Sequence, residues 1–300
     1  MNKPSEKHHY LSQKYLQGFV NKEGKFFCYD KQDDKFFEST PKTTFFQKKL
    51  NTITFKDGHS SDFMEGMYAY IENISWPAFD NIRASSSTTI IAISDKLDLS
   101  LFLFFLHWRL PTNISIVENL SNTVFEDKEI NFFSLVQKNG QKVSKEVLDI
   151  IKNDPAFKKS LKLLLPFAPF HKKDKDWQND ILRWRFLYPA DNKNWYIVGD
   201  NPIITDGTND QNPAKCLKEF VFPISGKILL VNTNPPPNQV FPPELIIQYN
   251  LALIHRANRF VASSDKNLLE TSVKLYKFYK EYGKTEEIIP RFFEGIKLKK

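Results

Sequence analysis

The feature that most constrains the fold is a strongly apolar segment at residues 96–110, preceded by the helix-capping pair Ser94-Asp95. Almost every position between 97 and 106 is apolar, with Asp98 and Ser100 as the interruptions. This run is far shorter than the roughly 20 residues that a membrane-spanning helix needs. Because a helix that is apolar on all sides must be surrounded by other elements, we expect a central core helix here. We also expect a cytoplasmic protein without a membrane partner, since residues 1–10 are polar and lack a signal-peptide pattern.

The elements around this helix predict an α+β fold in which helix predominates. We expect one intertwined domain over residues 1–300, made of an N-terminal β arm (1–56), a helical middle (60–190) and a mixed β/α portion (194–300). Pro77 should kink or restart the helix that begins at Ser61 or Asp62. The other expected elements are a hairpin at 25–37, helices at 113–125, 144–152, 156–165, 178–188, 244–257 and 265–282, strands at 195–198, 203–205, 219–223, 227–231 and 259–262, and a basic C-terminal tail.

The charge balance is compatible with a nucleic-acid partner. The 300 residues carry a net charge of +7, and their Lys and Arg total 42. Only seven of these 42 are arginine and 35 are lysine, so the charge reflects either a phosphate-binding face or a general lysine-rich composition. The scarce arginines are therefore the more informative residues. Arg183, Arg185, Arg256 and Arg259 are our candidates for nucleic-acid binding, with helix packing as the alternative.

Histidines and carboxylates suggest a metal site. His8 and His9 are adjacent, Glu65 and Glu72 lie two helical turns apart, and Asp200 follows an expected strand. Imidazole and carboxylate groups of this kind bind Mg, Mn or Zn and activate water. We expect all five to be catalytic, with His9, Glu72 and Asp200 holding a divalent ion. In the alternative interpretation the glutamates are solvated, the histidines cap a short helix, and the Asp200 carboxylate stabilises its own turn.

Arg109 is the remaining catalytic candidate, in the last turn of the apolar helix. It is expected either to anchor a substrate phosphate or a site glutamate, or to bond the final helix carbonyls. The only two cysteines are too few for a disulfide framework or a four-cysteine zinc site. No P-loop, GxGxxG, GxSxG, HExxH or CxxC pattern is present, so the sequence gives no support for the enzyme classes that these motifs define.

Five short motifs follow one another in a fixed order along the chain. They are His8-His9 with Tyr15-Leu16-Gln17-Gly18-Phe19, the helix with Glu65 and Glu72, Arg109-Leu110-Pro111-Thr112, Asp200-Asn201-Pro202, and Phe222-Pro223-Ile224-Ser225. With these motifs the chain resembles the DUF4238 family of bacterial proteins. Two positions depart from the family pattern: Ser12 stands where proline is common, and Leu110 separates the arginine from Pro111. The family is one of unknown function, so the resemblance implies site positions and no reaction.

Three functional hypotheses follow from these residues. The first is a metal-dependent nuclease-like effector that acts on nucleic acid, with bacterial antiviral defence as its setting. The second is a non-catalytic binding or sensor module of a defence system, in which the polar cluster holds a ligand. The third is a metal-independent nucleotide- or glycosyl-type transferase. A protein partner or a homo-oligomer is compatible with each hypothesis.

Overall fold

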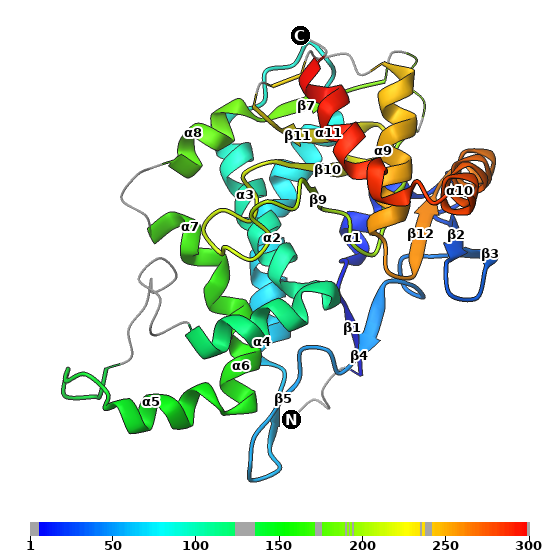
Figure 1. The fold of residues 1–300 in the computed structure, drawn as a ribbon. Coiled ribbons are helices and arrows are strands. Elements are labelled where there is room, and N and C mark those ends of the chain that lie inside the picture. Colours follow the sequence, from blue (N-terminus) through cyan, green and yellow to red (C-terminus); the bar gives the residue numbers. More distant parts are fainter. Residues whose placement is uncertain are drawn as a thin grey trace.

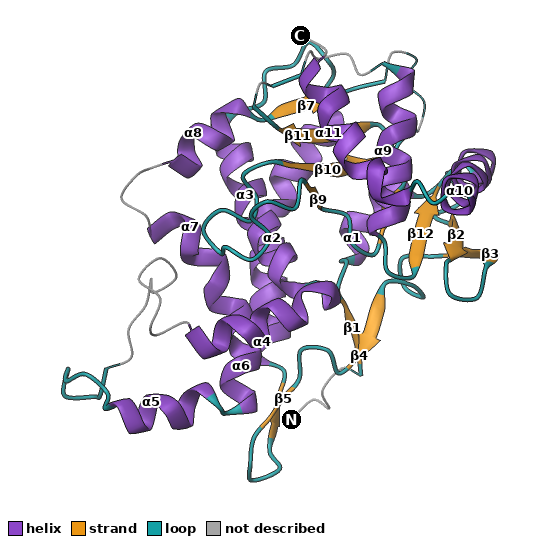
Figure 2. Cartoon of the chain, viewed as in Figure 1, coloured by secondary structure: helices purple, strands orange, loops and turns teal. Residues whose placement is uncertain are grey.

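The computed structural model describes residues 6–123, 136–171, 176–189, 191, 193, 195–234, 236–237 and 242–298. The α+β class with predominant helix is confirmed (Figure 2). Among these residues no helix combines the length and apolar character that crossing a membrane requires.

Two long helices occupy the centre of the molecule (Figure 1). Helix α2 (Phe63–Ala84) packs against α3 (Ile93–Arg109), which is the apolar segment predicted to be central, and nearly all of the second half of α3 is buried. Pro77 lies within α2, which is one continuous helix, so the predicted restart does not occur. The surrounding helices are η2 (Pro111–Asn113), α4 (Ile114–Thr123), α5 (Lys145–Lys152), α6 (Pro155–Leu164), η3 (Leu165–Phe167), α7 (Ala168–His171) and α8 (Asp176–Arg183).

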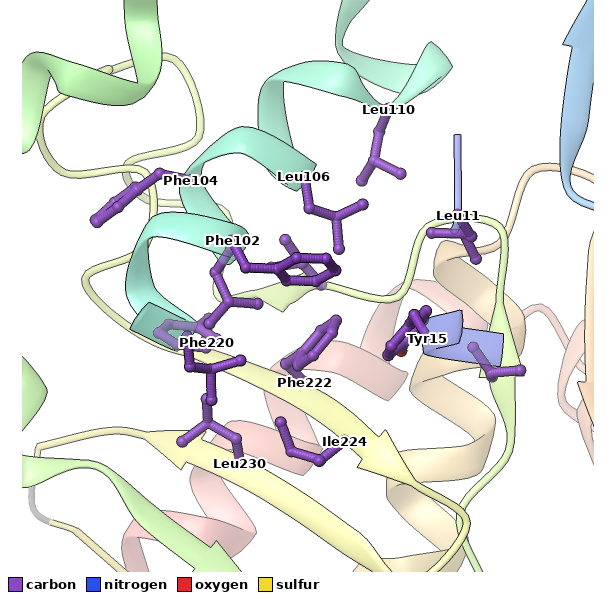
Figure 3. Packing of buried hydrophobic residues seen from close by; sticks show 14 of the residues in the cluster. Leu11, Tyr15, Phe102, Phe104, Leu106, Leu110, Phe220, Phe222, Ile224 and Leu230 are labelled. Atoms are coloured by element: carbon purple, nitrogen blue, oxygen red, sulfur yellow. The ribbon is translucent and has the colours of Figure 1, made fainter. Parts of the chain in front are cut away.

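One four-stranded antiparallel sheet has the order β7 (Arg185–Leu187), β11 (Ile228–Asn232), β10 (Phe220–Ser225), β9 (Ile204–Thr205). Strands β10 and β11 are buried along their whole length. Side chains of α3 such as Phe102 and Leu106 point toward Phe222 of β10 in Figure 3. The predicted helix at 178–188 is wrong in its second half, because helix α8 ends at Arg183 and residues 185–187 pair with β11 instead.

A second four-stranded sheet joins the two ends of the sequence. Its order is β3 (Lys35–Ser39), β2 (Phe26–Asp30), β12 (Phe260–Ser263), β8 (Val198–Gly199), and all its pairs are antiparallel. The predicted N-terminal hairpin is therefore completed by two strands from the second half of the chain, β12 and β8. Two smaller pairs, β1 (Lys7–His9) with β4 (Phe46–Lys48) and β5 (Ile53–Thr54) with β6 (Ser60–Ser61), lie below it in Figure 1.

The segment after β1 is threaded into the core. Tyr15 of α1 (Gln13–Leu16) is fully buried, stacks on the Phe222 ring at 5.2 Å and donates its hydroxyl proton to the Pro223 carbonyl at 2.8 Å. The backbone N–H of Gly226 donates to the Gly18 carbonyl at 3.0 Å, just after the short turn η1 (Gln17–Phe19) begins. Figure 3 shows Tyr15 lying between α3 and β10.

Three helices close the C-terminal side: α9 (Pro243–Arg256), α10 (Lys266–Glu281) and, after the turn η4 (Thr285–Glu287), α11 (Ile288–Leu298). The prediction of a basic tail was wrong, since residues 288–298 form a helix that packs on α9. Phe292, Phe293 and Ile296 are buried there, because their spacing places all three on one helix face.

Candidate functional site

The N-terminal strand β1 brings His8 against the start of α2. His8 is fully buried, and its Nδ1 atom accepts a hydrogen bond from the Asn51 backbone N–H at 3.0 Å. Its Nδ1 lies 3.6 Å from the Glu65 carboxylate, which also accepts a 2.5 Å bond from the Asn51 side chain. The structure thus brings His8 and Glu65 together, in a network that fixes β1 and the 49–54 segment on α2.

Arg109 ties the same strand to both central helices. Its Nη1 atom bonds the Glu72 carboxylate at 2.5 Å, its Nη2 atom donates to the His9 carbonyl, and its guanidinium lies 4.6 Å from the centre of the Tyr68 ring. Arg109 is only 6 % exposed. Burial raises the pKa of Glu72, while the neighbouring guanidinium opposes that rise. The void beside this ion pair measures about 10 Å³, too small for a substrate.

The imidazole of His9 has a different neighbour, Phe46. Its ring packs against Phe46 at 5.6 Å, and burial lowers its pKa, which favours the neutral imidazole. The Nε2 atom is buried and forms no hydrogen bond with any residue that the structure describes. His9 therefore contributes its backbone carbonyl to Arg109, while its imidazole packs on Phe46.

Asp200 lies in a different environment. It is 4 % exposed, and its two oxygens accept backbone N–H bonds from Asn258 at 2.7 Å, Arg259 at 2.7 Å and Phe260 at 3.0 Å. Burial raises its pKa, and these three N–H groups oppose that rise. The carboxylate thus fastens the turn after β8 to the connection between α9 and β12, and its partners come from that distant connection rather than from its own turn.

The expected metal ligands His9, Glu72 and Asp200 are consequently not brought together. Glu72 is held by Arg109, and Asp200 is held by backbone amides. Throughout the described ranges, no three side chains of the His, Cys, Asp and Glu types are grouped so that they could hold a metal ion. The predicted cluster is thus a network of His8, Glu65, Glu72 and Arg109, with Asp200 in a separate place.

A large cavity lies elsewhere, where η2 and α4 face the end of α9. We call it the polar cavity; its volume is about 890 Å³, and its lining is rich in asparagine, threonine and glutamine side chains. The 207–212 loop forms one wall. Thr112 and Asn201, which belong to two of the motifs singled out above, both line it. Its volume is within the range of small-molecule sites.

An ion pair lies at the wall of the polar cavity. Arg256 bonds Asp210 at 2.7 Å and contacts the Thr205 hydroxyl at 3.4 Å, in both cases through Nη2. Nearby His107 is only 3 % exposed, and burial lowers its pKa to about 4, so its ring is neutral. Within the described part of the chain, three buried atoms here have no hydrogen-bond partner: Nε of Arg256, Oδ1 of Asp210 and Nε2 of His107.

A smaller cavity of about 270 Å³ adjoins this region and shares Thr112 with the polar cavity. It is lined by Asp200, Tyr10 and Arg259 among others. Arg259 bonds the buried carboxylate of Asp30 through Nε at 3.0 Å and Nη2 at 2.8 Å. This candidate arginine therefore has a structural partner and borders a cavity.

The other two predicted arginines, Arg183 and Arg185, have different partners from each other. Arg183, at the end of α8, pairs with Asp180 and lines a third cavity of about 290 Å³. Arg185 is in β7, and its Nη1 contacts the backbone carbonyls of Arg183 and Trp184, each at 3.4 Å. The four arginines do not form one basic face.

Sequence reasoning missed the residues that give the polar cavity its chemistry. Asp210 lies in a loop without periodic pattern, and His255 was overlooked beside Arg256. The one available signal was the density of Asn, Asp, Thr and Gly at 206–212, which indicates a loop whose polar groups require partners.

Together, the fold and cavities define an α+β protein with an open polar chamber, to which the motif residues Thr112 and Asn201 contribute. A family model matches residues 7–267, and the chain belongs to that family, DUF4238, described as "Protein of unknown function". No curated protein and no solved structure matches the chain.

Proposed function

We propose that this protein is a binding module for a small phosphorylated ligand, of the nucleotide or sugar-phosphate class, held in the polar cavity. The observation that carries the proposal is the Arg256–Asp210 pair with its unpartnered buried atoms, beside a chamber of about 890 Å³. Buried polar atoms are nearly always hydrogen-bonded in folded proteins. A ligand, or water ordered with it, would supply the missing partners.

Arg256 is the proposed anion anchor. All its hydrogen bonds to other described residues leave from Nη2, so Nη1 and Nε make none. A guanidinium with free N–H groups suits a phosphate, which it can bond in a bidentate manner. Asp210 would accept hydrogen bonds from ligand hydroxyl groups, and it would also shift on the 207–212 loop as the phosphate approaches Arg256.

The rest of the lining favours a ligand with many hydroxyl groups. Asparagine and glutamine side chains both donate and accept hydrogen bonds, and Asn201, Asn209 and Asn212 all face the chamber. No aromatic side chain other than the imidazole of His255 lines it among the described residues, so stacking contributes little. The neutral His255 ring, whose pKa burial lowers, adds a further donor or acceptor.

The test is isothermal titration calorimetry with adenosine and guanosine 5′-monophosphates, glucose 6-phosphate and inorganic phosphate. Wild-type protein should bind at least one of these probes. Arg256→Gln should weaken that binding about 10- to 100-fold, because a charged hydrogen bond contributes about 1.5–3 kcal/mol.

Arg291→Gln is the matched control, since this exposed arginine of α11 pairs with Glu287 of η4. A second variant, Thr208→Trp, fills the mouth of the cavity from an exposed loop position and should also abolish binding. The proposal fails if no probe binds the wild-type protein, or if Arg256→Gln and Thr208→Trp both bind as tightly as the control.

The metal-dependent nuclease, the transferase and the role in antiviral defence stay predictions from the sequence. For the nuclease, single- and double-stranded DNA and RNA are incubated with the protein and Mg²⁺, Mn²⁺ or Zn²⁺. Cleavage that a chelator stops and that Glu72→Gln abolishes, in a variant that still folds, would favour the nuclease over the binding module.

A further inference from the structure

The third cavity borders the same loop as the polar cavity, at residues 206–218. Residues 207–212 of this loop line the polar cavity, whereas Ala214, Lys215, Leu217 and Lys218 line the third cavity, together with residues of α8 and α3. We call it the aromatic-basic cavity and define it by Trp177, Arg183, Trp184, Lys215 and Lys218. The two cavities share no lining residue.

Aromatic side chains form the inner part of this cavity. Trp177 is half-buried and is held edge-on to Phe170 at 4.8 Å, while Trp184 is buried against Phe220 at 5.6 Å. Phe104 of α3 also contributes to the lining. These contacts fix the indole of Trp177 beside a space of about 290 Å³, which suits one planar ring system.

Cationic side chains form the rim. Lys215 and Lys218 belong to one tight turn, in which the Lys218 backbone N–H donates to the Lys215 carbonyl at 3.0 Å. Both side chains are exposed, and neither ammonium pairs with a carboxylate in the parts of the chain that the structure covers. Arg183 adds a third cation, whose buried Nε has no partner among those residues, and Asp180 is the one carboxylate of the lining.

We propose that the aromatic-basic cavity binds one unpaired nucleobase by stacking on Trp177, with the adjoining phosphate on Lys215 and Lys218. An indole stacks on any base, because every base presents a π face, and lysines at the rim neutralise the backbone. The cavity has room for a single base and not for a duplex. The Asp180 carboxylate and the Asn179 amide also line it and can bond the exocyclic groups of the base.

This inference does not rest on the ligand proposed for the polar cavity. It adds a second site with the opposite character: the polar cavity offers hydrogen bonds and one balanced ion pair, while this one offers stacking and an excess of positive charge. The base and phosphate can come from a free mononucleotide or from a single strand, and the experiment distinguishes these two sources.

The experiment measures binding of a fluorescently labelled oligothymidylate of about ten nucleotides by anisotropy, and binding of uridine 5′-monophosphate by calorimetry. Trp177→Ala should weaken binding about 5- to 100-fold, the range found for removing one stacked base contact. Trp177→Phe, which keeps an aromatic ring, should restore most of the affinity. Lys215→Gln with Lys218→Gln should weaken oligonucleotide binding and reduce the slope of log affinity against log salt by about 1.4.

Lys22→Gln with Lys227→Gln is the charge-matched control, because both lysines are exposed and lie outside the cavity. Binding of both probes assigns the site to mononucleotides as well as strands, and binding of the oligonucleotide alone assigns it to single strands. Absence of binding for both probes, or equal affinity of wild type and Trp177→Ala, overturns the proposal. The proposal is also overturned if the control pair weakens oligonucleotide binding as much as the Lys215/Lys218 pair does.

Discussion

The neutral, buried imidazole of His107 gives a prediction about stability that can be calculated from the structure. His107 is on the last turn of α3, close to Asp210 and Arg256, and burial lowers the pKa of its ring from 6.5 to about 4. The folded protein therefore resists protonation of this ring, whereas the unfolded chain accepts a proton below about pH 6.5.

The direction in which stability changes with pH follows from this difference between the folded and unfolded states. As pH falls from 6.5 toward 4, the unfolded state binds a proton that the folded state does not, so the free energy of unfolding decreases. The pKa values of His107 in the unfolded and folded states differ by about 2.5 units, so the free energy of unfolding falls by about 3 kcal/mol once both states are protonated. About 2 kcal/mol of this fall already occurs between about pH 7.5 and pH 5. His107→Gln removes the titrating group, so this share of the pH dependence should disappear whatever the variant's stability at neutral pH.

Urea unfolding at the two pH values measures the effect in wild type and His107→Gln. His59→Gln, the same substitution at an exposed histidine of the β5–β6 turn, is the control for loss of a histidine. The reasoning is refuted if His107→Gln loses as much stability as wild type between pH 7.5 and pH 5, to within about 0.5 kcal/mol.

Three further predictions concern buried polar groups, each measured by urea unfolding. Asp200→Ala leaves three backbone N–H groups without an acceptor and should lower the free energy of unfolding by about 3–5 kcal/mol. Asp200→Asn keeps one acceptor oxygen and should lower it by about half as much. A decrease below about 1 kcal/mol for the alanine variant would contradict this prediction. Arg109→Met leaves the buried Glu72 carboxylate without its cation and should lower the free energy of unfolding by about 3 kcal/mol. Adding Glu72→Gln to the same chain should recover part of this loss. If nothing is recovered, the unpaired charge is not its cause. Tyr15→Phe removes one buried hydrogen bond and should cost about 1 kcal/mol, and an unchanged midpoint would disprove its contribution.

The regular elements were largely predictable from the sequence, because their signals are local. The apolar run at 96–110 fixes a buried helix, and Asp62 and Ala84 bound the preceding helix as expected. The C-terminal helix was predictable as well, since Phe292 and Ile296 lie four residues apart, but the terminal lysines suggested a tail.

The site was less predictable because the hydrogen-bond and ion-pair partners of its residues lie far away in the sequence. The Asp-Asn-Pro pattern indicates a turn, yet the backbone groups that bind the Asp200 carboxylate come from residues 258–260. Arg109 bonds Glu72 of α2, and the sequence could not show that this pair is closed to solvent. The polar cavity and the aromatic-basic cavity both border the 206–218 loop, whose composition carries no periodic signal.

The threading of residues 8–19 into the core affects the order in which the protein can be made. Tyr15 bonds a carbonyl 208 residues later in the chain, and the strand that covers it is complete only at Ser225. During translation the apolar side chains of this early segment thus emerge from the ribosome long before their cover exists. Packing of this segment is complete only once the final third of the chain is made, and until then its side chains are apolar surface of the kind that chaperones bind.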